Sequence, residues 1–121
     1  MLALIPDMSD HTISVTASGM VTATDYEAVL IPAVEAAFAT HGKVRVLYHL
    51  GPSFSGFTPG AMWDDMKMGL AHIRGWQRIA VVTDLEWIAG ATRLFGFAMP
   101  CETRVFSNRD LGRATEWIGA D

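Results

Sequence analysis

The stretch Arg-Ile-Ala-Val-Val-Thr-Asp-Leu-Glu at residues 78–86 decides the fold class. Its continuous apolar run, residues 79–82, is typical of a central parallel strand that is covered on both faces. Thr83 and Glu86 then form a capping box, in which two side chains bond the free amides at the start of a helix. A buried strand that leads directly into a helix indicates an α/β domain.

The segments after this stretch continue the alternation of strands and helices. The helix that begins near Thr83 is expected to end before Pro100, because proline disfavours helical backbone in the residue that precedes it. Residues 102–106 then favour a strand. A last helix is expected to be capped within residues 107–110, and its apolar side chains share one face: Leu111, Ala114, Trp117 and Ile118.

The segments before this stretch predict a strand, a long loop and a helix. Residues 43–50 are rich in branched and aromatic side chains, as strands are. Residues 51–60 carry glycine, proline and serine and are expected to form the long irregular segment of the chain. Long loops in small domains are often functional. Thr58 and Pro59 suit the N-cap and first position of a helix that runs to about residue 74.

The first helix is expected to begin at a capping box formed by Thr24 and Glu27. Gly42 is a good helix stop. Pro32 lies inside this helix and lacks the amide that would continue the hydrogen-bond ladder. We therefore expect a kink or a break near residues 28–32.

The resulting order is β-β-α-β-α-β-α-β-α, beginning with a hairpin over residues 2–5 and 12–17 whose turn falls on residues 6–10. This order predicts right-handed crossovers and a mixed, mostly parallel sheet of about five strands with about four helices. Half of the residues are hydrophobic (50%), which is enough to build a core without disulfides. We expect residues 1–121 to form a single domain.

Composition excludes several classes of function. The single cysteine, Cys101, has no partner for an internal disulfide, and the N-terminal segment lacks the pattern of a signal peptide, so a reducing cytoplasm is expected. No apolar run approaches the roughly 18 residues of a membrane-spanning helix. A net charge of -4 with scattered basic residues argues against nucleic acid as a partner.

Several short motifs follow one another along the chain: Tyr26 with Pro32, Gly-Lys-Val-Arg-Val-Leu at residues 42–47, Trp-Asp-Asp-Met-Lys at 63–67, and 78–84 followed by Trp87. Together with the order of elements, these motifs resemble the STAS-domain superfamily, and more closely its SpoIIAA-like family. The resemblance extends over nearly the whole chain and implies a mixed sheet flanked by helices, no established enzymatic activity, and binding of apolar small molecules or association with membranes.

The resemblance also suggests a phosphorylation site. In anti-sigma-factor-antagonist proteins of the STAS type, a serine or threonine at the start of the helix after the third strand is phosphorylated, within a loop that carries an aspartate. The matching loop here is residues 51–60, where Ser53 and Ser55 are the candidate phosphosites and the aspartate is absent. Turn and capping roles also account for serine and threonine in such a loop.

An excess of large apolar side chains in the second half of the chain is the most informative feature. On the helix after residue 83, Ile88 and Phe95 define one face, while Trp87 and Leu94 define a second. One sheet does not bury both faces, so the second lines a pocket, contacts another subunit or rests on a membrane. A well-filled core is the alternative. The candidate apolar ligand-binding residues are Phe54, Phe57, Trp63, Met66, Trp87, Leu94 and Phe95.

Acid–base and metal chemistry find little support. Asp65 and His72 stand two helical turns apart, which is too far for one metal ion, and a solvated helix face explains the aspartates. Cys101 has no neighbouring cysteine. We therefore expect no cofactor, no metal and no catalytic residue. An enzyme would need a partner for Asp64, Asp65, His49 or Cys101.

Two functions remain as hypotheses. The first is a non-enzymatic domain that binds an apolar small molecule or lipid, or associates peripherally with a membrane. The second is a protein-interaction regulator switched by phosphorylation within residues 51–60 and recognised by a regulatory protein partner. A homodimer formed through the second apolar face is a further hypothesis.

Overall fold

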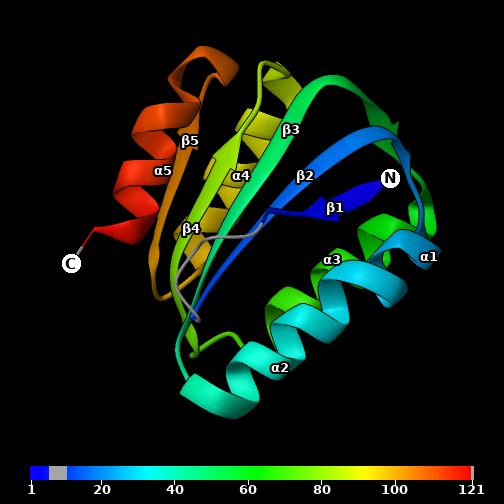
Figure 1. The fold of residues 1–121 in the computed structure, drawn as a ribbon. Helices are drawn as coiled ribbons and strands as arrows, with labels where there is room; N and C mark the ends of the chain where they lie inside the picture. The colour runs from blue at the N-terminus through cyan, green and yellow to red at the C-terminus, as the bar shows by residue number, and fades with distance from the viewer. Residues whose placement is uncertain (6–10, 121) are drawn as a thin grey trace.

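The computed structural model describes residues 1–5 and 11–120. Their backbone forms one five-stranded sheet in the order β1-β2-β3-β4-β5, in which β1 is antiparallel to β2 and the other neighbours are parallel (Figure 1). The α/β fold and the mostly parallel sheet are therefore confirmed. The predicted turn at residues 6–10 lies outside the described residues. The strands are β1 (Leu2–Leu4), β2 (Thr12–Val21), β3 (Val44–Phe57), β4 (Trp76–Val82) and β5 (Glu102–Phe106).

The helices cover the sheet unequally. Because the parallel strands advance in one direction through right-handed crossovers, all the connecting helices lie on one face. The last helix, α5, packs on the opposite face (Figure 1). The helical segments are α1 (Ala23–Asp25), the π-helical turn η1 (Tyr26–Leu30), α2 (Ile31–His41), α3 (Pro59–Ala71), α4 (Glu86–Ala98), the 3-10 turn η2 (Asn108–Asp110) and α5 (Leu111–Gly119).

The face under α5 is closed by small and branched side chains. Ala114 and Ile118 of α5 are fully buried against a second core cluster that includes Leu47, Ala80 and Val82. The predicted apolar stripe of the last helix is thus present, with Leu111 and Trp117 packed partly buried beside it.

Two arginines from the sheet fix the end of this helix. Arg45 and Arg78 each donate to the last carbonyls of α5, at 2.8 Å to Ile118 O and Trp117 O respectively. A cationic side chain satisfies carbonyls that lack helical partners and interacts favourably with the negative end of the helix. Strands β3 and β4 therefore anchor α5 at its C-terminus.

The segment predicted as a loop, residues 51–60, is mostly strand. β3 continues to Phe57, and Phe54 is buried, so the expected loop is wrong. Beyond His49 the strand no longer pairs with β4, and residue 52 falls in the register shift against β2, so Pro52 leaves no ladder position unfilled. Gly19 of β2 takes a φ of 59° at this shift, a conformation that favours glycine.

The helix starts also differ from those expected. The first helical segment is capped by a reciprocal pair, Thr22 and Asp25, rather than by Thr24 and Glu27. Helix α4 has no side-chain cap, because Thr83 bonds the amide of Leu85 instead of forming a capping box.

The predicted irregularity before Pro32 is a π-helical turn, η1, in which the amide of Ile31 bonds the carbonyl of Tyr26. Such turns contain one residue more than an α-helical turn and are frequent at functional sites. Here the turn holds Tyr26 and Leu30 fully buried against the sheet.

Candidate ligand-binding cavity

A cavity of about 490 Å³ lies between the sheet and helices α3 and α4. Its wall is predominantly apolar, with side chains from both helices, from the inner face of the sheet and from η1. The residues that define it include Leu30, Val46, Leu50, Phe57, Met62, Met66, Trp76, Ile79, Val81, Trp87, Ile88, Ala91 and Phe95.

Two close contacts hold the helices around this space. At one end, α4 approaches β5 so closely that a Cβ added at Gly96 would lie 3.2 Å from the Cβ of Thr103. Toward α3, the ring of Phe95 reaches Gly69, where an added Cβ would lie 3.5 Å from the ring. Helix α4 contacts the sheet chiefly through β5. Helix α4 therefore packs against the edge strand of the sheet, and the cavity lies between this helix and strands β3 and β4.

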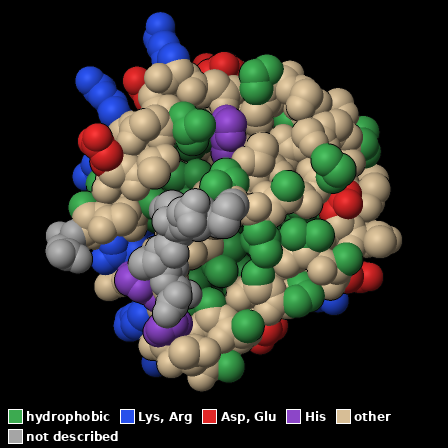
Figure 2. Space-filling model, viewed as in Figure 1, with side chains coloured by type: hydrophobic (Ala, Val, Ile, Leu, Met, Phe, Trp, Pro, Cys, Tyr) green, Lys and Arg blue, Asp and Glu red, His purple; other side chains and the backbone are tan. Residues whose placement is uncertain are grey.

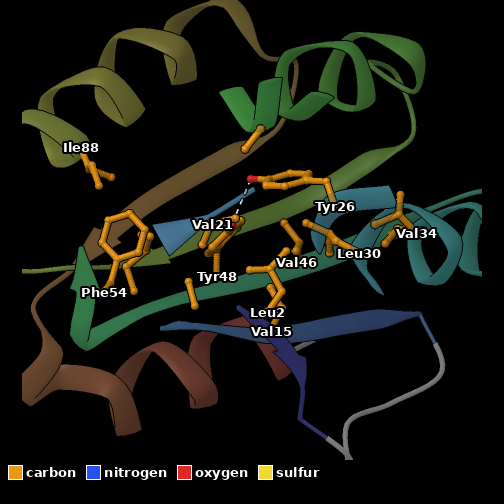
Figure 3. Packing of buried hydrophobic residues seen from close by; sticks show 14 of the residues in the cluster. Leu2, Val15, Val21, Tyr26, Leu30, Val34, Val46, Tyr48, Phe54 and Ile88 are labelled. Atoms are coloured by element: carbon orange, nitrogen blue, oxygen red, sulfur yellow. Dashed lines mark hydrogen bonds between the residues drawn. The ribbon is translucent and has the colours of Figure 1, made fainter. Parts of the chain in front are cut away.

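A polar chain forms one part of the otherwise apolar wall. The hydroxyl of Tyr26 donates to Oδ1 of Asp65 at 2.9 Å, and it is also 2.9 Å from the hydroxyl of Tyr48. Figure 3 shows the two tyrosine rings meeting from η1 and β3, with their hydroxyl groups joined by a dashed line. We call Tyr26, Tyr48 and Asp65 the polar relay. All three line the cavity.

Burial changes the acidity of every group in the polar relay. It raises the pKa of the Tyr26 and Tyr48 hydroxyls, so both stay protonated. Desolvation also raises the pKa of Asp65, and the hydrogen bond from Tyr26 opposes this effect only in part. Asp65 nevertheless keeps accessible surface and lines the cavity, so a small molecule in the cavity can reach its carboxyl group.

The structure brings together four of the seven predicted apolar residues, namely Phe57, Met66, Trp87 and Phe95, which all line the cavity. Phe54 instead packs in the core against Phe57, with ring centroids 4.9 Å apart. Trp63 and Leu94 lie outside the wall, and their exposed fractions are 57% and 73%.

The polar relay is absent from the predicted site residues. Of the two aspartates expected on a solvated helix face, Asp65 is exposed as expected but also bonds Tyr26, whereas Asp64 is buried and this part of the expectation is wrong. The signal for the relay lies in the tyrosines. Tyr26 and Tyr48 occupy inward positions of a helix and a strand, and a buried tyrosine hydroxyl needs a hydrogen-bond partner. Since Asp65 comes from a third element, only the fold reveals that it is this partner.

The residues considered for catalysis do not converge. His49 bonds Asn108 through Nε2 at 3.0 Å, on the opposite face of β3 from Tyr48. Burial raises the pKa of the Cys101 thiol, which makes it a weaker nucleophile. Among residues 1–5 and 11–120, no group of three His, Cys, Asp or Glu side chains is placed to hold a metal ion.

The described part of the chain contains no helix that is both long and apolar enough to cross a membrane.

In the view of Figure 2, the Lys and Arg side chains on the visible face lie along its margin, whereas hydrophobic side chains gather across its middle.

The family model described as SpoIIAA-like matches residues 12–119, which is most of the chain. The chain belongs to the SpoIIAA-like family. The resemblance inferred from the motifs is therefore confirmed.

A solved structure supports the same SpoIIAA-like fold. It is the crystal structure of an uncharacterised protein of the DUF3478 family from Shewanella loihica PV-4, described as having a SpoIIAA-like fold. It is similar to this chain with a TM-score of 0.75 and 29% sequence identity, over 97% of this chain and 93% of that one. No curated protein matches the sequence.

Proposed function

We propose that this SpoIIAA-like domain binds an apolar small molecule or the acyl part of a lipid in the cavity between the sheet and helices α3 and α4. The cavity itself supports this proposal. Its volume of about 490 Å³ falls in the range of roughly 300–1,000 Å³ that is usual for small-molecule sites. Each methylene group transferred from water into such a site contributes about 0.8 kcal/mol. Binding would therefore be driven mainly by the hydrophobic effect.

Membership of the SpoIIAA-like family supports a non-enzymatic role. The chemistry of the wall agrees with binding rather than reaction, because the three side chains of the polar relay bond one another and the apolar side chains offer no reactive group. The methionines Met62, Met66 and Met68 add a flexible surface that adapts to ligands of different shape.

Titration with the fluorescent apolar probe N-phenyl-1-naphthylamine tests the proposal. We expect saturable binding by the native protein and strong loss of binding in Ala91→Phe, because Ala91 lines the cavity and the added ring would occupy part of it. Ala36→Phe on the exposed side of α2 is the matched control and should bind the probe normally. Equal binding by both variants would place the probe outside the cavity and contradict the proposal.

A specific observation favours a second candidate function, peripheral contact with a lipid surface. Helices α3 and α4 expose several large apolar side chains next to the cavity, of which Phe97 is 90% and Leu94 is 73% exposed. A net charge of -4 favours a neutral surface over an anionic one. We expect the protein to sediment with phosphatidylcholine vesicles, and Leu94→Ser with Phe97→Ser to abolish this. Sedimentation that the double variant leaves unchanged would exclude contact through this face.

The phosphorylation-switched regulator has less support. Ser53 and Ser55 are exposed, as a phosphosite needs to be. They lie within β3, however, rather than at a helix start, so a phosphate there would gain nothing from a helix dipole.

A further inference from the structure

The direction of the hydrogen bonds in the polar relay follows from its number of protons. A tyrosine hydroxyl carries one proton. Tyr26 donates this proton to Oδ1 of Asp65, so the bond between the two tyrosines must use the proton of Tyr48. Tyr48 therefore donates its hydroxyl proton to Tyr26, and Tyr26 donates its own to Asp65. Neither proton is available to a ligand.

The donors of most other polar side chains in the cavity wall are engaged or buried, whereas the indole N–H of Trp87, whose side chain is 54% exposed, has no described partner. Trp76 donates its indole N–H to the carbonyl of Gly69 at 3.0 Å, and Thr92 donates its hydroxyl to the carbonyl of Ile88 at 2.8 Å. The hydroxyl oxygen of Thr103 is itself buried, next to Gly96 of α4. Among the residues that the structure describes, the wall contains no lysine, arginine or histidine.

What the polar relay leaves open are acceptors. The oxygen of Tyr48 donates its proton away and retains lone pairs, and Oδ2 of Asp65 has no described partner while its residue keeps accessible surface. An anionic head group would meet oxygen acceptors and a carboxyl group, and like charges this close disfavour one another. A head group with an O–H or N–H would satisfy these acceptors.

Given the proposed function, on which this step rests, we propose that the ligand is an amphiphile whose head group donates a hydrogen bond, an alcohol or an amine rather than a carboxylate. The head group bonds Asp65 and Tyr48, and the apolar part lies along α3 and α4, against Met66, Trp87 and Phe95. An ammonium head group would in addition pair with Asp65 when its carboxyl group is ionised.

Competition by three ligands of equal chain length tests this selectivity. Decanol, decylamine and decanoate would each displace N-phenyl-1-naphthylamine at pH 8, below the concentrations at which they self-associate. We expect decanol and decylamine to bind at least tenfold more tightly than decanoate, a ratio that corresponds to about 1.4 kcal/mol. Equal affinities, or a preference for decanoate, would overturn the inference while leaving apolar binding intact. Failure of all three ligands and of the probe would instead overturn the proposed function.

Substitution of Asp65 assigns the selectivity to the polar relay. Asp65→Asn has nearly the same shape but offers an N–H donor and carries no charge. This variant should bind decylamine about tenfold or more weakly than the native protein does, and it should bind decanoate more tightly. Glu86→Gln, which removes an exposed carboxylate outside the cavity wall, should change neither. An unchanged order of affinities in Asp65→Asn would overturn the assignment. If this variant does not fold, Tyr48→Phe, which removes the other acceptor, should weaken decanol in its place.

Discussion

The two faces of the sheet solve the same packing problem in opposite ways. Under α5, small and branched side chains such as Ala80 and Ala114 interlock and fill the space between the layers. Under α3 and α4, much larger side chains such as Trp87 and Phe95 surround a cavity of about 490 Å³. Side-chain size therefore does not decide which face is filled. On the second face, helices α3 and α4 make close contacts at Gly69, which the ring of Phe95 reaches, and at Gly96, which lies next to Thr103.

The largest expected effect is on the closed face. Ile118→Ala removes a fully buried side chain from the core under α5 and should lower the free energy of unfolding by about 2–5 kcal/mol. Phe95→Ala on the open face removes a larger but partly exposed side chain (38%) and should cost about 1 kcal/mol. Urea denaturation monitored by circular dichroism measures both. Equal losses would mean that the two faces contribute similarly to stability.

Replacing one alanine on each face of the sheet by leucine tests the difference between the filled face and the face with the cavity. Ala114→Leu would force extra volume into a filled layer and cost about 1–3 kcal/mol. Ala91→Leu on α4 points the same added volume toward the cavity and should change stability by no more than about 0.5 kcal/mol. Thermal unfolding of the two variants decides the matter, and a large loss in Ala91→Leu would show that the cavity has no room for the added side chain.

The smallest effect concerns the pH dependence of stability. Because burial raises the pKa of Asp65 above its ordinary 3.8, the folded state holds this proton at pH values where the unfolded state has lost it. Stability must therefore fall as the pH rises above about 3.8, until the folded-state pKa is passed. Asp65→Asn should remove this decline, so that the variant gains on the native protein as the pH rises. Urea denaturation from pH 4 to pH 8 measures the free energy of unfolding of both proteins. If this free energy changed with pH in the same way in both, the result would contradict the prediction.

The alternation of strands and helices is predictable from the sequence because each signal is local. The apolar run at residues 79–82 and the N-cap Thr58 act through neighbours along the chain, and both appear as expected within β4 and at the start of α3. The strand character of residues 51–57 escapes prediction because glycine, proline and serine usually mark loops. Its cause is not local, since the register shift at Gly19 lies on another strand.

The residues of the candidate site likewise fall into those that the sequence predicts and those that only the fold brings together. Phe57, Met66, Trp87 and Phe95 stand out as an excess of large apolar residues, a property that composition records. The polar relay joins three elements over sequence separations of 22 and 39 residues, and no spacing pattern announces such a contact. Trp63 and Leu94 share the composition signal but point elsewhere, which only the helix orientation reveals.

The π-helical turn η1 makes one part of this chain unusually sensitive to changes of length. Its extra residue sets the rotation of everything upstream of Leu30 relative to α2. Deletion of a single codon within this turn would restore a regular helix and turn Tyr26 by about 100° around the helix axis. The tyrosine would leave both Tyr48 and Asp65. Evolution can therefore create or erase the polar end of the cavity with one in-frame deletion or insertion, and relatives without this extra residue should line the same cavity with different chemistry.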